Sequence, residues 1–221
     1  MKRALHLFRQ AIPFVLWAGF FLLFSLALTL TIKFALSRGE LSLLFLGHIT
    51  GGTVFLGLGA LQFLAQVRNR YMRFHRINGR IMLVAALISI GCLYAMLPNS
   101  QCNACMPSQI TVTTLWLFSL VAAWIAIRRG DVAAHRIHMA RGFVSASYFL
   151  IVRLVDQLIG LERLLPFVNS EDGRLANSDW LAWVVPVLVV EAITRLTTTH
   201  VVARIVRPNN SFKPKPLRGS A

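Results

Sequence analysis

The stretch RYMRFHRINGR, residues 70–80, stands directly before a long apolar run, and RRGDVAAHRIHMAR, residues 128–141, does nearly the same further along the chain. Each stretch crowds arginine and histidine into a few positions and contains the tripeptide His-Arg-Ile, beginning at His75 and at His135. Basic residues gathered at one end of an apolar segment are typical of helices that meet the cytoplasmic face of a membrane. The two stretches therefore predict a pair of equivalent membrane helices that begin on the same side.

The composition agrees with a membrane protein. The chain has 221 residues, of which 56% are hydrophobic and 14% are charged, a balance outside the range of soluble globular proteins. We expect an all-α polytopic bundle of about six transmembrane helices, since about 20 apolar residues cross the hydrocarbon. The first run is long and has no small-residue cleavage site close behind it, so we expect a retained anchor. The runs lie near residues 13–36, 43–66, 80–97, 109–127, 140–160 and 179–202.

The formal net charge of +15 is explained by topology. Most of the 23 Lys and Arg residues lie in alternating connecting segments, which places those segments and both termini in the cytoplasm. We expect a multi-pass protein of the bacterial inner membrane, with anionic lipid headgroups as its counter-charge and no nucleic-acid partner. Residues 1–12 would precede a single transmembrane domain, 13–206, and a disordered basic tail, 207–221, would follow it. The cytoplasmic basic residues are Lys2, Arg3, Arg9, Arg68, Arg70, Arg73, Arg76, Arg80, Arg128, Arg129, Arg136, Arg141, Arg204, Arg207, Lys213, Lys215 and Arg218.

A weak internal repeat organises the middle of the chain. FHRINGRIML and AHRIHMARGF align, and each belongs to a larger unit of apolar helix, arginine-rich turn, His-Arg-Ile and second apolar helix. Because both turns are expected on the cytoplasmic side of the membrane, the two units would be parallel repeats related by an axis along the membrane normal. We expect a four-helix core built from two hairpins, flanked by the first and last helices.

The middle of the chain contains the motifs LFLGHITGG, GLGALQF, HRINGRIMLVAALIS and AAHRIHMARGF, the last of them followed by an Arg-Leu pair. These motifs resemble those of an uncharacterised bacterial multi-pass membrane-protein family, domain of unknown function 2306. The resemblance covers roughly residues 43–155 and implies a multi-pass bacterial membrane protein, without an assigned activity. Where the family usually has an aromatic residue, three places after His135, this chain has His138.

His75 and His135 are candidate ligands of one haem iron. In b-type cytochromes, imidazoles from different helices ligate the iron, and Arg76 and Arg136 would suit pairing with the propionates. His138 shares a helical face with His135 and could replace it. A haem b would make the protein a small membrane redox unit with a quinone or another redox partner. The alternative is that the His-Arg pairs reach the interface and bind lipid phosphate.

His48 is the candidate for a polar interior. Gly47 and Gly51 have the spacing that lets membrane helices approach closely, so the imidazole should meet another helix. Its expected partners are Arg153 and Asp156, three residues apart on one helix. Ionisable groups at that depth indicate a proton relay or the pocket of a small-solute carrier, or else a satisfied network that holds the bundle together.

Cys102 and Cys105 lie in an outward-facing loop, where a close pair can form a disulfide. Such a pair is also the reactive unit of thiol oxidoreductases, and it is similar to that of disulfide-generating, quinone-coupled membrane enzymes. Those enzymes use a second cysteine pair, and only Cys92 remains here. A structural staple is therefore favoured over catalysis.

No nucleotide-binding or hydrolase motif is present, so a nucleotide-driven or hydrolytic activity has no support in the sequence. The sequence does not decide whether the chain is another kind of enzyme. Glu191 and Arg195, four residues apart, are expected to form an ion pair within one helix. Two functions compete: a haem-binding redox protein, and a non-enzymatic solute carrier or membrane interaction protein.

Overall fold

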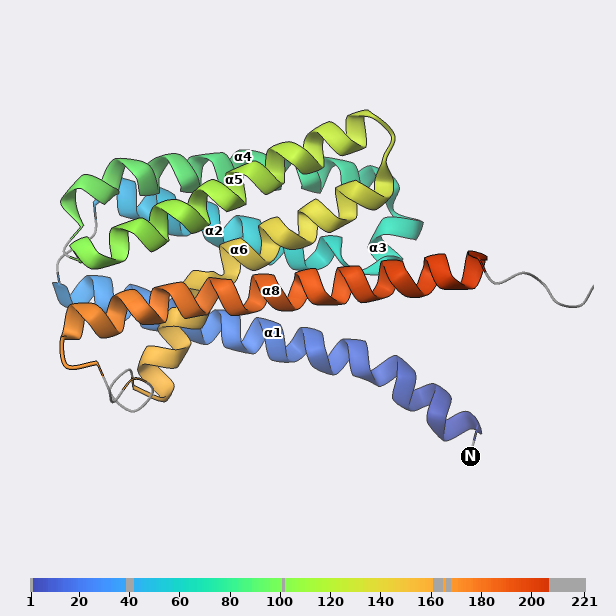
Figure 1. Ribbon diagram of the computed structural model, residues 1–221, viewed down its shortest axis with the longest axis horizontal. Helices are drawn as coiled ribbons and strands as arrows, with labels where there is room; N and C mark the ends of the chain where they lie inside the picture. The colour runs from blue at the N-terminus through green and yellow to red at the C-terminus, as the bar shows by residue number, and fades with distance from the viewer. Residues whose placement is uncertain (1, 39–41, 101, 161–164, 166–167, 207–221) are drawn as a thin grey trace, which may run out of the picture.

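The computed structural model describes residues 2–38, 42–100, 102–160, 165 and 168–206. The expected disordered tail, 207–221, lies outside these residues. All regular structure in the described residues is helical, which confirms the predicted all-α membrane bundle. The long helices run side by side (Figure 1): α1 (Lys2–Arg38), α2 (Leu43–Gln62), α4 (Met72–Met96), α5 (Met106–Arg128), α6 (Val132–Leu158) and α8 (Glu171–Val206).

Several helices begin before the apolar run that predicted them. α6 starts at Val132 because Asp131 caps it, accepting a hydrogen bond from the Ala134 backbone N–H at 2.9 Å. Gly130, with φ of +79°, makes the tight turn that precedes the cap. In the other hairpin a short helix, α3 (Ala65–Arg70), fills the turn, and α4 starts at Met72. Both His-Arg-Ile tripeptides therefore lie in the first turns of helices.

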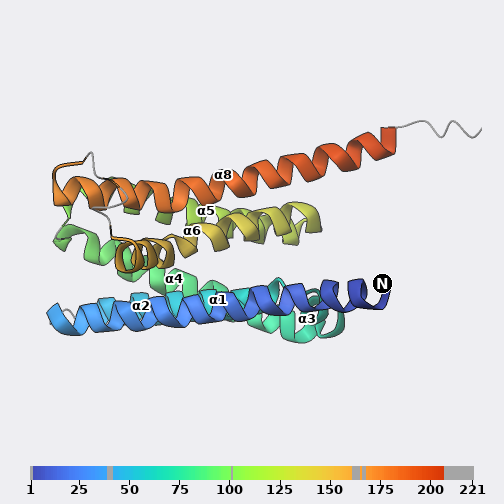
Figure 2. The ribbon, with the colours of Figure 1, turned by 90° about the horizontal axis from the view of Figure 1, so that it is seen from below.

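The helices pair as two hairpins. α2 packs along α4, and α5 packs along α6, as the internal repeat predicted. α8 packs against α6, and α1 crosses α6 from the opposite side, so that in Figure 2 α6 lies between α8 and α1. The first and last helices thus flank the core.

The two ends of the bundle differ in chemistry. The start of α1, helix α3, the α5–α6 turn and the end of α8 all lie at one end in Figure 1. We name it the arginine-rich end, after Arg68, Arg70, Arg128 and Arg129. The opposite end carries the disulfide between Cys102 and Cys105 and is named the disulfide end. This arrangement is the one that the predicted topology requires.

Three stretches among the described residues are long and apolar enough to cross a membrane: Leu43–Gln62, Met72–Asn99 and Asn103–Arg128. A shorter apolar stretch of α1 covers Trp17–Lys33. Many large apolar side chains on these helices are exposed, as expected of surfaces that face lipid rather than water. The six-crossing arrangement stays a prediction.

Candidate functional site

A cavity of about 50 Å³ lies inside the bundle, bordered by α1, α2, α4, α5 and α6. Most of its lining is apolar, but polar side chains reach it from each of these helices. The volume is enough for a few water molecules, because each occupies about 10–15 Å³ measured in this way. The polar residues of the lining are Thr31, His48, Thr53, Ser89, Thr113, Trp116 and Tyr148.

His48 is held in one orientation by Ser89 of the neighbouring helix. Its Nδ1 lies 3.0 Å from the Ser89 carbonyl oxygen, and the Ser89 hydroxyl donates to the His48 carbonyl oxygen at 2.9 Å. Because a carbonyl oxygen only accepts, the proton of the imidazole lies on Nδ1 and leaves Nε2 as an acceptor. Gly51 makes this pairing possible, since it lets α2 approach the backbone of α4 closely.

Of the predicted trio of His48, Arg153 and Asp156, the lining of this cavity includes His48. The edge of the Phe149 ring meets His48, with ring centroids 6.2 Å apart, and the Arg153 guanidinium lies 5.4 Å from the centroid of the same ring. Phe149 therefore links His48 to Arg153. Within the described part of the chain, the cavity lining includes His48 but neither Arg153 nor Asp156.

Two buried polar atoms at the cavity have no hydrogen-bond partner in the described structure: Thr113 Oγ1 and Trp116 Nε1. The two side chains are 1% and 5% exposed. The neighbouring Thr111 and Thr114 bond to carbonyl groups of their own helix, so Thr113 differs from them. A buried unpaired polar atom costs about 1–3 kcal/mol, so a hydrogen-bonding group placed in the cavity would offset this cost.

Sequence reasoning missed Thr113, Trp116 and Tyr148. A threonine in an apolar helix carries no mark that separates it from Thr111 or Thr114. The signal that identifies these residues is the convergence of five helices, which is a property of the tertiary structure.

The two candidate haem ligands lie at the arginine-rich end. His135 Nδ1 donates to the Ala123 carbonyl oxygen at 3.0 Å, which leaves Nε2 as the free lone pair. His75 Nδ1 is buried without a partner among the described residues. The rings are close enough to interact electrostatically, and the side chains of Arg76 and Arg136 are exposed beside them.

His138 belongs to a different cluster. Its Nδ1 accepts a hydrogen bond from Arg141 at 3.4 Å, and Arg141 forms an ion pair with Glu191 of α8, with Nη2 and Oε2 3.0 Å apart. Burial, followed by the charge of Arg141, lowers the pKa of His138. Between the two alternatives for the second ligand, this placement favours His135. Arg141 is a partner of Glu191 that the sequence, which suggested Arg195, did not reveal.

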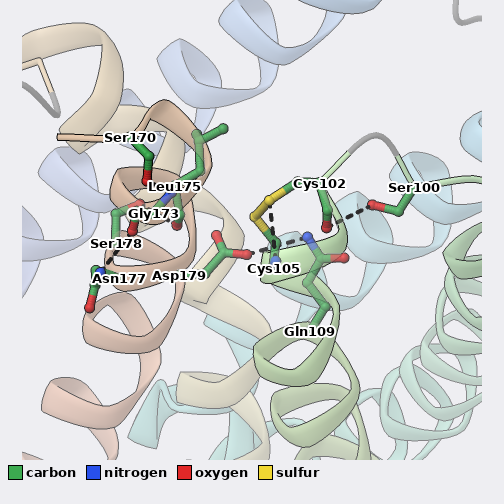
Figure 3. Close-up of a disulfide and its surroundings, with 10 residues drawn as sticks. All are labelled: Ser100, Cys102, Cys105, Gln109, Ser170, Gly173, Leu175, Asn177, Ser178 and Asp179. Atoms are coloured by element: carbon green, nitrogen blue, oxygen red, sulfur yellow. Dashed lines mark hydrogen bonds between the residues drawn. A yellow bond between two sulfur atoms is a disulfide. The ribbon is translucent and has the colours of Figure 1, made fainter. Parts of the chain in front are cut away.

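The disulfide end carries the third candidate site (Figure 3). Cys102 and Cys105 form a disulfide with Cα atoms 5.3 Å apart. One turn into α5, Gln109 Nε2 donates to Asp179 Oδ2 at 3.3 Å and so joins the start of α5 to α8. The described residues contain no group of three or more His, Cys, Asp or Glu side chains that could hold a metal ion.

Long apolar helices whose large apolar side chains are exposed define a helical membrane protein. The chain belongs to the family described as predicted membrane protein DUF2306, whose model matches residues 45–194. This confirms the resemblance of the sequence motifs. The matched region includes the two candidate haem ligands, the cysteine pair and the cavity lining apart from its α1 residues. No curated protein and no solved structure matches the chain.

Proposed function

We propose that the protein is a membrane carrier for a small, uncharged polar solute, which binds in the cavity between the hairpins. The observation that supports this is the pair of unpartnered atoms, Thr113 Oγ1 and Trp116 Nε1, beside the fixed acceptor His48 Nε2. An occupant that hydrogen-bonds to these groups would offset the cost of burying them.

The chemistry of the lining indicates the class of solute. Trp116 donates only, so it suits a carbonyl oxygen, and neutral His48 accepts from an N–H group. The polar groups that border the cavity are neutral, so a charged solute would be left without a counter-charge. With a volume of about 50 Å³, the site suits amides of a few heavy atoms, such as urea or acetamide.

Entry of urea into proteoliposomes tests this proposal. We expect liposomes that contain the protein to swell faster in urea or acetamide than protein-free liposomes, and no faster in glucose. Thr113→Val keeps the shape of the side chain, and Trp116→Phe keeps an aromatic ring of smaller size. Each change removes one hydrogen-bonding group. Each should slow urea entry about fivefold, because a hydrogen bond contributes about 1 kcal/mol.

The matched controls are Thr111→Val and Trp124→Phe, which alter exposed side chains on the same helix. They should leave the rate of urea entry unchanged. Equal swelling of protein-containing and protein-free liposomes would contradict the carrier function.

A second candidate function rests on a separate observation, the orientation of His135. Its Nδ1–H bond to Ala123 leaves Nε2 available for a metal, as in many metal-ligating histidines. His75 and His135 would hold the iron of one b-type haem, and Arg76 and Arg136 would bind its propionates. The haem would supply one-electron transfer near the arginine-rich end.

The reduced-minus-oxidised absorption spectrum of protein expressed with a haem precursor tests the second candidate. We expect a b-type band that is lost in both His75→Ala and His135→Ala and retained in His138→Ala, because His138 is bound to Arg141. A flat spectrum at stoichiometric protein would exclude haem while leaving the solute cavity untouched.

A further inference from the structure

The cysteine pair at the disulfide end lies where a loop becomes a helix. Cys102 caps the short 3-10 helix Asn103–Cys105, and Cys105 directly precedes the first residue of α5, Met106. The backbone N–H of Cys105 donates to Cys102 Sγ at 3.2 Å (Figure 3). A sulfur that accepts a backbone hydrogen bond next to a helix N-terminus is stabilised as a thiolate.

The two sulfur atoms differ in access. Cys105 is buried, with 3% of its surface exposed, whereas Cys102 is only partly buried. We therefore expect an incoming thiol to reach the partly exposed Cys102 rather than the buried Cys105. A disulfide with one accessible and one protected sulfur has a defined point of attack, because exchange proceeds by attack of a thiolate on one of the two sulfurs.

A buried acid lies beside this pair. Asp179 is 6% exposed and is the one acidic residue among the described residues that is buried. It accepts a hydrogen bond from Gln109, which follows Cys105 by one helical turn, and α8 packs against the turn that carries Cys105. Figure 3 shows the Asp179 carboxyl group turned from α8 toward Gln109 and α5.

We propose that Cys102–Cys105 is an exchangeable disulfide that oxidises dithiols at the disulfide end of the bundle. One thiol of the substrate loses its proton to solvent, and its sulfur attacks Cys102 Sγ. The Cys102–Cys105 bond breaks, and Cys105 leaves with the electron pair and takes up a proton, which Asp179 is placed to supply. The second substrate thiol loses its proton and attacks the mixed disulfide, which releases the oxidised substrate.

In this exchange the substrate dithiol is the reductant and the protein disulfide is the oxidant. Two electrons pass from the two substrate sulfurs to the protein disulfide, which becomes two thiols. Cys102 leaves in the second attack as a thiolate, and the N–H of Cys105 stabilises it. This thiol–disulfide exchange involves neither the solute cavity nor a haem.

Equilibration of the purified full-length protein with glutathione redox buffers is the first test. A maleimide reagent that adds mass to each free thiol reports the reduced fraction. Because structural disulfides resist reduction by glutathione, a staple would stay oxidised in every buffer without denaturant, and that result would overturn the proposal. We expect full reduction within the glutathione range.

Single-cysteine variants test the direction of attack. In a Cys92→Ser background, which removes the third cysteine, Cys105→Ser leaves Cys102 as the one free thiol and should form a mixed disulfide with oxidised glutathione at least tenfold faster than Cys102→Ser. Equal rates would overturn the assignment of Cys102 as the attacked sulfur.

Asp179→Asn tests the positioning of the proton. We expect it to slow reduction by dithiothreitol about tenfold while the equilibrium in glutathione buffers stays unchanged, a split that a purely structural role would not produce. Asp172→Asn, at an exposed position in the first turn of α8, is the matched control. An unchanged rate in Asp179→Asn would remove this residue from the step.

Discussion

Gly51→Ala will unfold the α2–α4 hairpin at a markedly lower temperature than the native chain. A Cβ atom at this position would lie 2.5 Å from the Ala85 carbonyl oxygen and 3.0 Å from both the Cβ and the backbone nitrogen of Ser89. These are atoms of the α4 helix or fixed close to its backbone, so the clash cannot be relieved by rotating a flexible side chain. The two helices must move apart.

The separation would also weaken the pairing between His48 and Ser89, because its hydrogen bonds join the same two helices. Overpacking of a close contact costs about 1–3 kcal/mol, and the lost hydrogen bonds add about 1 kcal/mol each. Thermal unfolding in detergent, followed by circular dichroism, measures the effect.

Gly57→Ala is the matched control on the same helix, since nothing lies within 4 Å of the position that the added methyl group would occupy. Alanine is favoured over glycine in a helix by about 1 kcal/mol, so this variant should be as stable as the native protein or more stable. If both variants unfold at the same temperature as the native protein, that result would contradict the close contact between α2 and α4 at Gly51.

Phe55→Ala should produce the second large loss of stability. Phe55 is fully buried, at 0% exposed, and its ring meets the face of Trp116 edge-on with centroids 4.9 Å apart. It also packs against Phe143, at 6.4 Å, and so connects α2 to both helices of the second hairpin. Within lipid, close packing rather than removal from water holds helices together.

Removal of this ring would leave a cavity where the two hairpins meet, and such changes cost about 3–5 kcal/mol. We expect the melting temperature in detergent to fall and the α2–α4 hairpin to separate from α5–α6 under milder denaturant. Phe118→Ala is the control, because Phe118 is 63% exposed on α5 and faces the lipid side. A similar melting temperature for the two variants would contradict this packing.

Local signals in the sequence were sufficient to predict the helices and the different chemistry of the two ends of the bundle. Each apolar run became one long helix, and the arginine-rich turns lie together, because membrane hydropathy and charge asymmetry depend on neighbouring residues. Signals in the sequence were weaker for the helical turns that precede the apolar runs of α4 and α6. They depend on the Asp131 cap and on the α3 turn, which hydropathy does not detect.

The candidate sites depended on contacts between distant residues. His48 was identifiable as a polar group on a glycine-lined face, and its partner Ser89 was not, because 41 residues separate them. The Arg141–Glu191 pair and the Gln109–Asp179 pair join residues 50 and 70 positions apart.

By itself, the sequence determined that this protein is a helical membrane bundle, which helices form its hairpins, and that Cys102 and Cys105 are close enough to pair. Only the tertiary structure decided that Thr113 and Trp116 meet His48 at one cavity, and that Asp179 lies beside the turn that carries Cys105. The physical reason is that hydropathy and charge place each helix along the membrane normal, whereas close packing decides its rotation and neighbours.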